Sequence, residues 1–109
     1  VKTRASPIAF IPLSTSGEVI VTDGDTIKRA SETIRLWGID APELHQICYK
    51  GEKEAACGQE AKKALQEILK SKQIDCTKIT TDRYKRSVSR CSVPNGDVGQ
   101  LMVTQGWAL

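Results

Sequence analysis

The sequence of 109 residues lacks any apolar run that approaches the roughly 20 residues needed to cross a bilayer. It also lacks internal repeats and low-complexity tracts, which excludes a repeat architecture. The hydrophobic fraction of 39% and the charged fraction of 27% are those of an ordinary globular protein. We therefore expect a single soluble domain with no membrane association.

The first 17 residues lack the long apolar core of a secretion signal, and they contain Pro7 and Pro12. They do not resemble an intact signal, so an exported form of this protein would already have lost its signal. We expect residues 1–16 to be an N-terminal extension and residues 17–109 to form the domain.

Histidine is almost absent, since His45 is the single example, and no two of the four cysteines form a Cys-x-x-Cys pair. These two absences argue against a zinc site. No partner for His45 is evident, so we expect it to be a loop residue rather than an acid or a base.

The cysteines are even in number, which in a small domain is compatible with two disulfides and with three ways of connecting them. Their positions along the chain suggest that Cys48 pairs with Cys57 and that Cys76 pairs with Cys91. The alternative is four reduced cysteines in the core of a cytosolic protein.

The net charge of +3 is small, but the charge is unevenly distributed. Residues 62–90 contain nine Lys or Arg against Glu67, Asp75 and Asp82, a net charge of +6, which leaves −3 for the rest of the chain. A basic region favours a polyanion, and an acidic cluster favours a cation. A solvated helix face followed by charged loops is the simpler explanation of the same pattern.

Turn signals and apolar alternation predict five strands, of which the first three form an antiparallel meander. An amphipathic helix is predicted from Gly58 to Lys70, between the third and fourth strands. Residues 44–57 are expected to be an irregular loop held by a disulfide. The expected strands are 19–21, 26–28, 33–39, 74–80 and 87–93.

The C-terminal part of the sequence predicts a second, short helix. Asp97 followed by Gln100 resembles a capping box, and Gly106 would end the helix. This order of elements is that of a β-rich α+β fold, a five-stranded OB-fold barrel with one helix between strands 3 and 4.

Four carboxylates fall at predicted strand ends or turns, namely Asp23, Asp25, Asp40 and Glu43. Turn chemistry explains each one alone. However, a hairpin that joins the second and third strands places Asp25 and Asp40 at the same end, where they need a compensating cation. Ca²⁺ accepts roughly 6 to 8 oxygen ligands, so several waters would remain bound. One such water is a candidate nucleophile for hydrolysis, with Glu43 as its candidate base.

Two arginines are candidates for binding a phosphoryl group. If Leu36 faces the core, alternation turns Arg35 to the opposite face, together with Trp37. The paired donors of Arg35 and Arg86 suit the equatorial oxygens of a phosphoryl group under attack. A surface ion pair is the simpler role for each arginine. Tyr84 is expected either to stack on a base or to pack its ring on the sheet.

Four segments resemble, in order and spacing, the characteristic blocks of the staphylococcal nuclease (thermonuclease) family. The resemblance runs from about Gly17 to the C-terminus. It implies an OB-fold and a monomeric, Ca²⁺-dependent phosphodiesterase, an endonuclease that cleaves DNA and RNA, prefers single strands and leaves 3′-phosphate ends. The four segments are 21–27, 34–43, 82–86 and 105–109.

The resemblance also implies a set of metal ligands. These are the carboxylates of Asp25 and Asp40 and the backbone carbonyl of Ala41, which stands where the family has threonine. Asp23 would lie near the metal without binding it directly.

The remaining site residues are implied in the same way. Arg35 and Arg86 would bind the phosphate, Glu43 would be the general base, and Tyr84 and Lys85 would contact the substrate. The four cysteines resemble those of exported bacterial members, which implies two disulfides and a periplasmic or secreted protein.

Two departures from the family pattern bear on activity. Lys85 occupies the position of a glycine, and if the backbone there needs a positive φ, lysine costs on the order of 1 kcal/mol and re-aims Arg86. The family also continues past the equivalent of Leu109 into a segment that completes the nucleotide pocket, so we expect weaker affinity. A catalytically weakened OB-fold nucleic-acid binding module is therefore the alternative function.

Overall fold

The computed structural model describes residues 18–109, and the predicted N-terminal extension lies outside these residues. The first three strands form the expected antiparallel meander. They are β1 (Val19–Asp23), β2 (Thr26–Arg29) and β3 (Glu32–Leu36). β3 ends three residues earlier than expected, because the chain turns at Gly38, whose φ is 82°.

The second half of the sheet is built on β7. β7 (Ser87–Val93) pairs in parallel with β3 and antiparallel with β6 (Asp75–Thr81) and with the short β8 (Gly96–Asp97). The sheet is therefore mixed, with the strand order β1-β2-β3-β7-β6.

The prediction of a closed five-stranded barrel is not confirmed. In the part of the chain that the structure describes, β1 and β6 are the two ends of the strand order and do not pair with each other. The residues of β6 are almost all exposed, so this strand has no apolar face to bury against β1. The β-rich fold with two helices is as expected, but the sheet is open.

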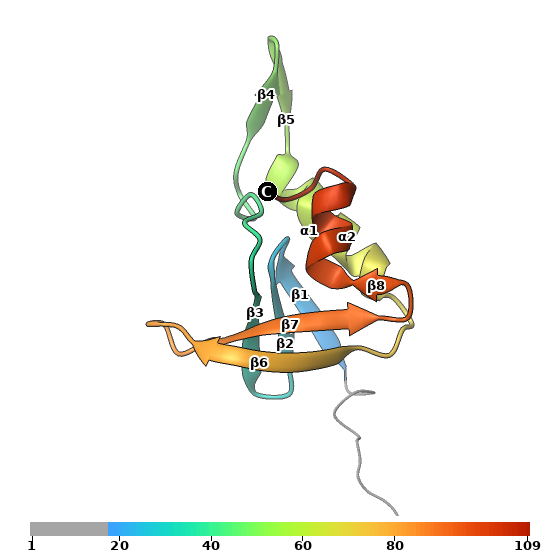
Figure 1. The fold of residues 1–109 in the computed structure, drawn as a ribbon. Helices are drawn as coiled ribbons and strands as arrows, with labels where there is room; N and C mark the ends of the chain where they lie inside the picture. The colour runs from blue at the N-terminus through green and yellow to red at the C-terminus, as the bar shows by residue number, and fades with distance from the viewer. Residues whose placement is uncertain (1–17) are drawn as a thin grey trace, which may run out of the picture.

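The two helices lie on the same side of the sheet (Figure 1). α1 (Cys57–Leu69) places Ala61, Leu65 and Ile68 in the core and leaves its lysines outside. α2 (Val98–Thr104) is capped by Asp97, whose carboxylate accepts the backbone N–H groups of residues 99 and 100. The buried sides of both helices join the apolar side chains of the strands in one core.

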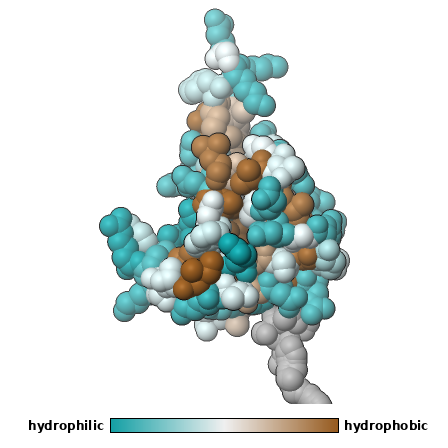
Figure 2. Space-filling view, in the orientation of Figure 1, coloured by the Kyte–Doolittle hydropathy of each residue, from teal (hydrophilic) through white to brown (hydrophobic). Residues whose placement is uncertain are grey.

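The expectation of an irregular loop at residues 44–57 was wrong for part of the segment. β4 (Cys48–Lys50) and β5 (Lys53–Ala55) form a hairpin that projects from the body of the protein (Figure 1). Its strands of three residues are too short and too charged to show an apolar alternation. The tip is hydrophilic and the region near the base is more hydrophobic (Figure 2).

Both pairs of cysteines form disulfides in the way that their positions suggested. The bond between Cys48 and Cys57 ties the β4–β5 hairpin to the start of α1. Cys76 and Cys91 lie directly opposite each other on β6 and β7, with their Cα atoms 4.0 Å apart.

The end of the chain folds back beside the end of β3. Gly106, with a φ of 84°, ends the last helical turn, and the N–H of Trp107 donates to the carbonyl of Met102. Leu109 and Asp40 then exchange two backbone hydrogen bonds, of 3.0 and 3.1 Å. Neither of the two helices within residues 18–109 is long and apolar enough to cross a membrane.

Candidate functional site

The turn between β1 and β2 is pressed against two other parts of the molecule. A Cβ atom added to Gly24 would lie 2.8 Å from the Cβ atoms of both Ala41 and Ala61. Glycine is therefore required by close approach, since any side chain would push the turn away from α1 and from the loop after β3. This packing fixes Asp23 and Asp25, the residues on either side of the glycine.

Asp25 is 6% exposed, and its carboxylate is held by its surroundings. The carboxylate accepts the backbone N–H of Ala41 at 2.9 Å and the hydroxyl of Thr26 at 3.0 Å. Burial is the main reason that the pKa of Asp25 is raised. The N–H of Ala41 and the guanidinium of Arg35 act in the opposite direction, and the nearby Asp23 adds to the rise.

Arg35 lies between the two carboxylates of the predicted metal site. Its Nη2 atom lies 3.4 Å from Oδ2 of Asp25 and 3.6 Å from Oδ1 of Asp40. Its Nη1 atom donates to the carbonyls of Leu36 and Ile39, both at 2.9 Å. The alternation in β3 thus turns Arg35 away from the core, and the backbone after β3 holds the guanidinium between the two carboxylates.

The loop that carries Arg86 is organised by Asp82. One carboxylate oxygen of Asp82 accepts the N–H groups of Tyr84 and Arg86, each at 2.9 Å, and the other accepts Nε of Arg86 at 2.7 Å. Partial burial acts to raise the pKa of Asp82, but the hydrogen bonds from Arg86 and Tyr84 outweigh it and lower the pKa. Lys85 has a φ of 66°, the left-handed conformation that favours glycine.

Tyr84 projects from the tip of this loop and is 65% exposed. The guanidinium carbons of Arg83 and Arg86 lie 5.1 and 5.3 Å from the centre of its ring. Its ring therefore packs against two cations at the surface and not on the sheet.

Arg35 and Arg86 line one open cavity of about 410 Å³, together with Asp40 and Asp82. Glu43 lies in a separate hollow, lined also by Asp23 and by the loop around His45. The structure therefore brings both arginines and Asp40 to one cavity, with Asp25 in contact with Arg35, while Glu43 lines the hollow of Asp23.

The position of Glu43 is set by the start of α1. A Cβ atom on Gly58 would lie 1.8 Å from the carbonyl oxygen of Glu43, so the helix touches this backbone directly. The N–H of Gly58 donates to the carbonyl of Gln46 at 3.2 Å, and the N–H of Gln46 donates to the carbonyl of Glu43 at 2.8 Å. His45 is exposed in this loop.

The donor atoms of the predicted metal ligands suit Ca²⁺, because carboxylate and carbonyl oxygens are its preferred ligands. Asp25 and Asp40 place two carboxylates beside the guanidinium of Arg35, and Asp23 accepts the backbone N–H of Asp25. Within residues 18–109, no group of three or more His, Cys, Asp or Glu side chains is placed to hold a metal ion. The predicted ligand set contains two carboxylates and one carbonyl, so water would have to complete the shell.

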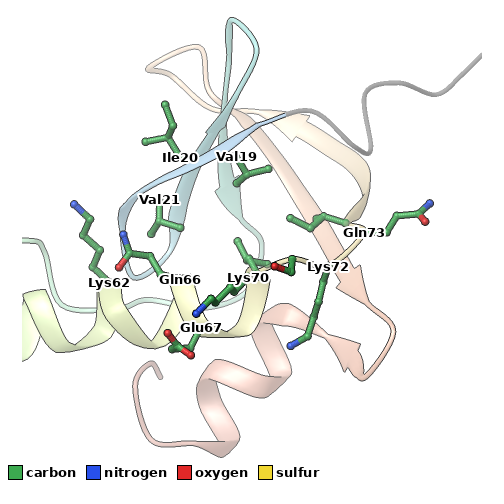
Figure 3. A pocket seen from close by; sticks show the side chains of 12 residues that line it. Val19, Ile20, Val21, Lys62, Gln66, Glu67, Lys70, Lys72 and Gln73 are labelled. Carbon is green, nitrogen blue, oxygen red and sulfur yellow. The ribbon is translucent and has the colours of Figure 1, made fainter.

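Another hollow, of about 880 Å³, lies between β1 and the end of α1. Val19 and Val21 point from β1 towards the helix, and the lysines at positions 62, 70 and 72 surround the opening (Figure 3). None of the predicted site residues lines it, so we place the functional site at the arginine cavity.

Three residues that position the site were not identified from the sequence, namely Asp82, Gly24 and Gly58. Asp82 precedes Tyr84 by two residues, and this spacing is a local signal for a side chain that accepts a backbone N–H. No comparable local signal marks Gly24 or Gly58, because their neighbours come from distant parts of the chain.

A family model described as "Staphylococcal nuclease homologue" matches residues 33–109. The match begins in β3 and continues to the C-terminus. It includes Arg35, Asp40, Glu43 and Arg86, whereas the turn between β1 and β2 precedes it.

Two curated relatives are similar over most of this chain. "Succinoglycan biosynthesis protein ExoI" of Rhizobium meliloti is 36% identical over 96 residues, which cover 85% of this chain and 50% of the relative. "Uncharacterized endonuclease" of Haemophilus influenzae is 32% identical over 95 residues, which cover 83% of this chain and 48% of the relative. The chain spans about half the length of these relatives.

Proposed function

Because the chain belongs to the family of staphylococcal nuclease homologues, we propose that it is a nuclease that hydrolyses phosphodiester bonds of DNA and RNA. The observation that carries the proposal is the shared cavity of Arg35 and Arg86, with two carboxylates against the first arginine. The relative named as an endonuclease supports the same activity. The proposal concerns the domain alone.

The two arginines bind the phosphoryl group. A phosphate diester gathers negative charge on its oxygens as it is attacked, and guanidinium groups meet these oxygens with paired donors. The backbone carbonyls that hold Nη1 of Arg35 fix the direction of its guanidinium. Arg86 donates Nε to Asp82, and its guanidinium has further N–H donors at Nη1 and Nη2 for the phosphate.

Water is the nucleophile, and Glu43 is the base that accepts its proton. The oxygen of water bonds to phosphorus while the bond from phosphorus to O5′ breaks, and O5′ gains a proton. The products are a 3′-phosphate and a 5′-hydroxyl. Glu43 is exposed, and the hollow that it shares with Asp23 gives water access to it.

Asp25, Asp40 and the carbonyl of Ala41 are the residues that would hold Ca²⁺, with Asp23 nearby. When bound, the ion would stabilise negative charge on the phosphoryl oxygens and lower the pKa of a bound water. The buried position of Asp25 supports this assignment, because a carboxylate whose pKa is raised by burial and by Asp23 gains from a nearby cation.

The substrate is nucleic acid with exposed bases, and Tyr84 and Lys85 contact it next to Arg86. Both residues are exposed and directly precede Arg86, which lines the cavity, and this supports the placement. We assign the protein to an oxidising compartment, the periplasm or the exterior, because it contains two disulfides.

The alternative function is a nucleic-acid binding module with weakened catalysis. The specific observation in its favour is the bond of 2.7 Å from Nε of Arg86 to Asp82, which takes one donor of the second arginine. Glu43 also lies outside the arginine cavity.

Incubation of denatured DNA with the protein, in Ca²⁺ or in a chelator, tests the proposal. We expect cleavage in Ca²⁺ alone, loss of cleavage in Arg35→Ala, and no change in Lys63→Ala, an exposed lysine outside the cavity. A folded protein that never cleaves would overturn the nuclease assignment. Salt-sensitive binding without cleavage would favour the binding module.

A further inference from the structure

Trp37 is a large aromatic side chain exposed beside the arginine cavity. It follows the last residue of β3 and is 46% exposed, whereas Leu36 is buried. Its backbone is fixed, since its N–H donates to the carbonyl of Ser89 at 2.9 Å. A rigid backbone that presents an indole to solvent is typical of a contact surface more than of a core.

The position of Trp37 relative to Arg35 suits a nucleotide. The two residues are two positions apart where β3 ends and the chain enters the turn at Gly38. Both line the cavity that also contains Arg86. A phosphate bound between the arginines would leave the attached nucleoside within reach of the indole.

The ring of Trp37 also has a cationic neighbour. The guanidinium carbon of Arg90, on β7, lies 4.6 Å from the centre of the ring. This contact orients the indole and adds a positive charge beside it. An aromatic ring next to cations is the combination that binds single-stranded nucleic acids, because every base has a π face and every nucleotide has a phosphate.

We propose that Trp37 stacks on the nucleobase next to the phosphate bound by Arg35 and Arg86, and so selects strands with unpaired bases. The inference rests on the proposed function, because it takes the arginine cavity as the phosphate site. A base within a duplex is stacked on both faces and is closed to the indole. Trp37 is therefore a specificity-determining residue rather than a catalytic one.

Binding in a chelator separates this role from cleavage. The probes are a labelled DNA single strand and a strand of equal length in which the nucleosides are abasic. We expect Trp37→Leu to bind the normal strand about tenfold more weakly and the abasic strand as the wild type does. Trp37→Phe should retain part of the difference between the strands, because phenylalanine can still stack.

The matched control is Tyr49→Leu, which removes an exposed aromatic ring from the β4–β5 hairpin. It should bind both strands like the wild type. If Trp37→Leu weakens both strands equally, or weakens neither, the inference is wrong. If Trp37→Leu does not fold, the wild type is compared with Trp37→Phe. An equal ratio of affinities for the normal and the abasic strand in these two proteins would also contradict the inference.

Failure of the stacking role and failure of the nuclease activity give different results in the binding and cleavage assays. Base-dependent binding through Trp37 without cleavage in Ca²⁺ would refute the nuclease assignment and support the stacking role. Cleavage in Ca²⁺ that remains equally selective for single strands in Trp37→Leu would refute the stacking role alone. A wild type that binds neither strand would overturn both.

Discussion

Nη2 of Arg35 lies 3.4 Å from Oδ2 of Asp25, a carboxylate that is almost fully buried. The same nitrogen lies 3.6 Å from Asp40, on the far side of the turn that ends β3. Arg35 therefore compensates the charge of both predicted metal ligands, in addition to its proposed role in binding phosphate. Stability and activity are coupled at this residue.

Arg35→Ala should lower the free energy of unfolding as well as activity. The substitution leaves the buried carboxylate of Asp25 without its guanidinium partner, and we expect a loss of about 1–3 kcal/mol. The measurement is denaturant unfolding at neutral pH. The double variant with Asp25→Asn should recover part of the loss, since the unpaired charge is then gone. Additive losses would contradict this coupling.

Ca²⁺ should raise the melting temperature of the wild type, because a ligand that binds the folded state stabilises it. At 100 times the dissociation constant the gain is about 2.7 kcal/mol. Asp40→Asn should abolish the gain without unfolding the protein, since the Asp40 side chain is exposed. Asp97→Asn is the control, because the Asp97 carboxylate caps α2 and is not among the predicted ligands. An equal Ca²⁺ response in Asp40→Asn would refute its role as a ligand.

Gly58→Ala should destabilise the protein although alanine favours helices. The added Cβ would meet the carbonyl of Glu43 at 1.8 Å, so the loop that carries the proposed base must move. We expect a loss of about 1–3 kcal/mol and a fall in nuclease activity, measured by thermal unfolding and by cleavage of denatured DNA. Gln59→Ala, at an exposed position in the same turn, should change neither.

Lys85→Gly should stabilise the loop between β6 and β7. Lys85 has a φ of 66°, a conformation that costs a side chain about 1 kcal/mol relative to glycine. Unfolding measurements should show a gain of about this size. Lys85→Ala is the matched control and should show no such gain, because alanine carries the same Cβ penalty. Equal stability of the two variants would show that the loop relaxes.

Local sequence pattern predicts some strands of the sheet better than others. Alternation predicts β7 at its observed bounds, and turn signals predict the meander of β1 to β3. The β4–β5 hairpin has strands of three residues and no apolar alternation, so its sequence resembles a loop. The sheet stays open because β6, its last strand, is exposed. This exposure depends on how all the strands are arranged and not on the sequence of β6 alone.

The placement of some site residues also follows from local sequence, and the placement of others does not. That Asp25 and Asp40 share one end of a hairpin, and that Arg35 leaves the core, follows from strand order and from a period of two. The placement of Glu43 in the hollow of Asp23 could not be predicted, because it depends on contact between the start of α1 and a distant loop. The bond between Asp82 and Arg86 depends on the path of the loop between them.

Asp82 should make stability depend on pH through its bonds to Arg86 and Tyr84. Partial burial opposes these bonds, but their sum lowers the pKa of Asp82 in the folded protein. The unfolded chain then binds the proton more tightly than the folded one. The stabilisation is therefore complete above the ordinary carboxyl pKa of about 3.9, and it is lost as the pH falls through the lower folded value.

Asp82→Asn isolates this contribution, because asparagine keeps the shape of the side chain but has no charge and does not titrate. Unfolding of both proteins from pH 7 to pH 2 should show the variant less stable at neutral pH. The difference should shrink once the pH drops below the ordinary carboxyl value, since Asp82 itself then becomes neutral. A difference that stays constant over this range would mean that charge does not hold Arg86 in its loop.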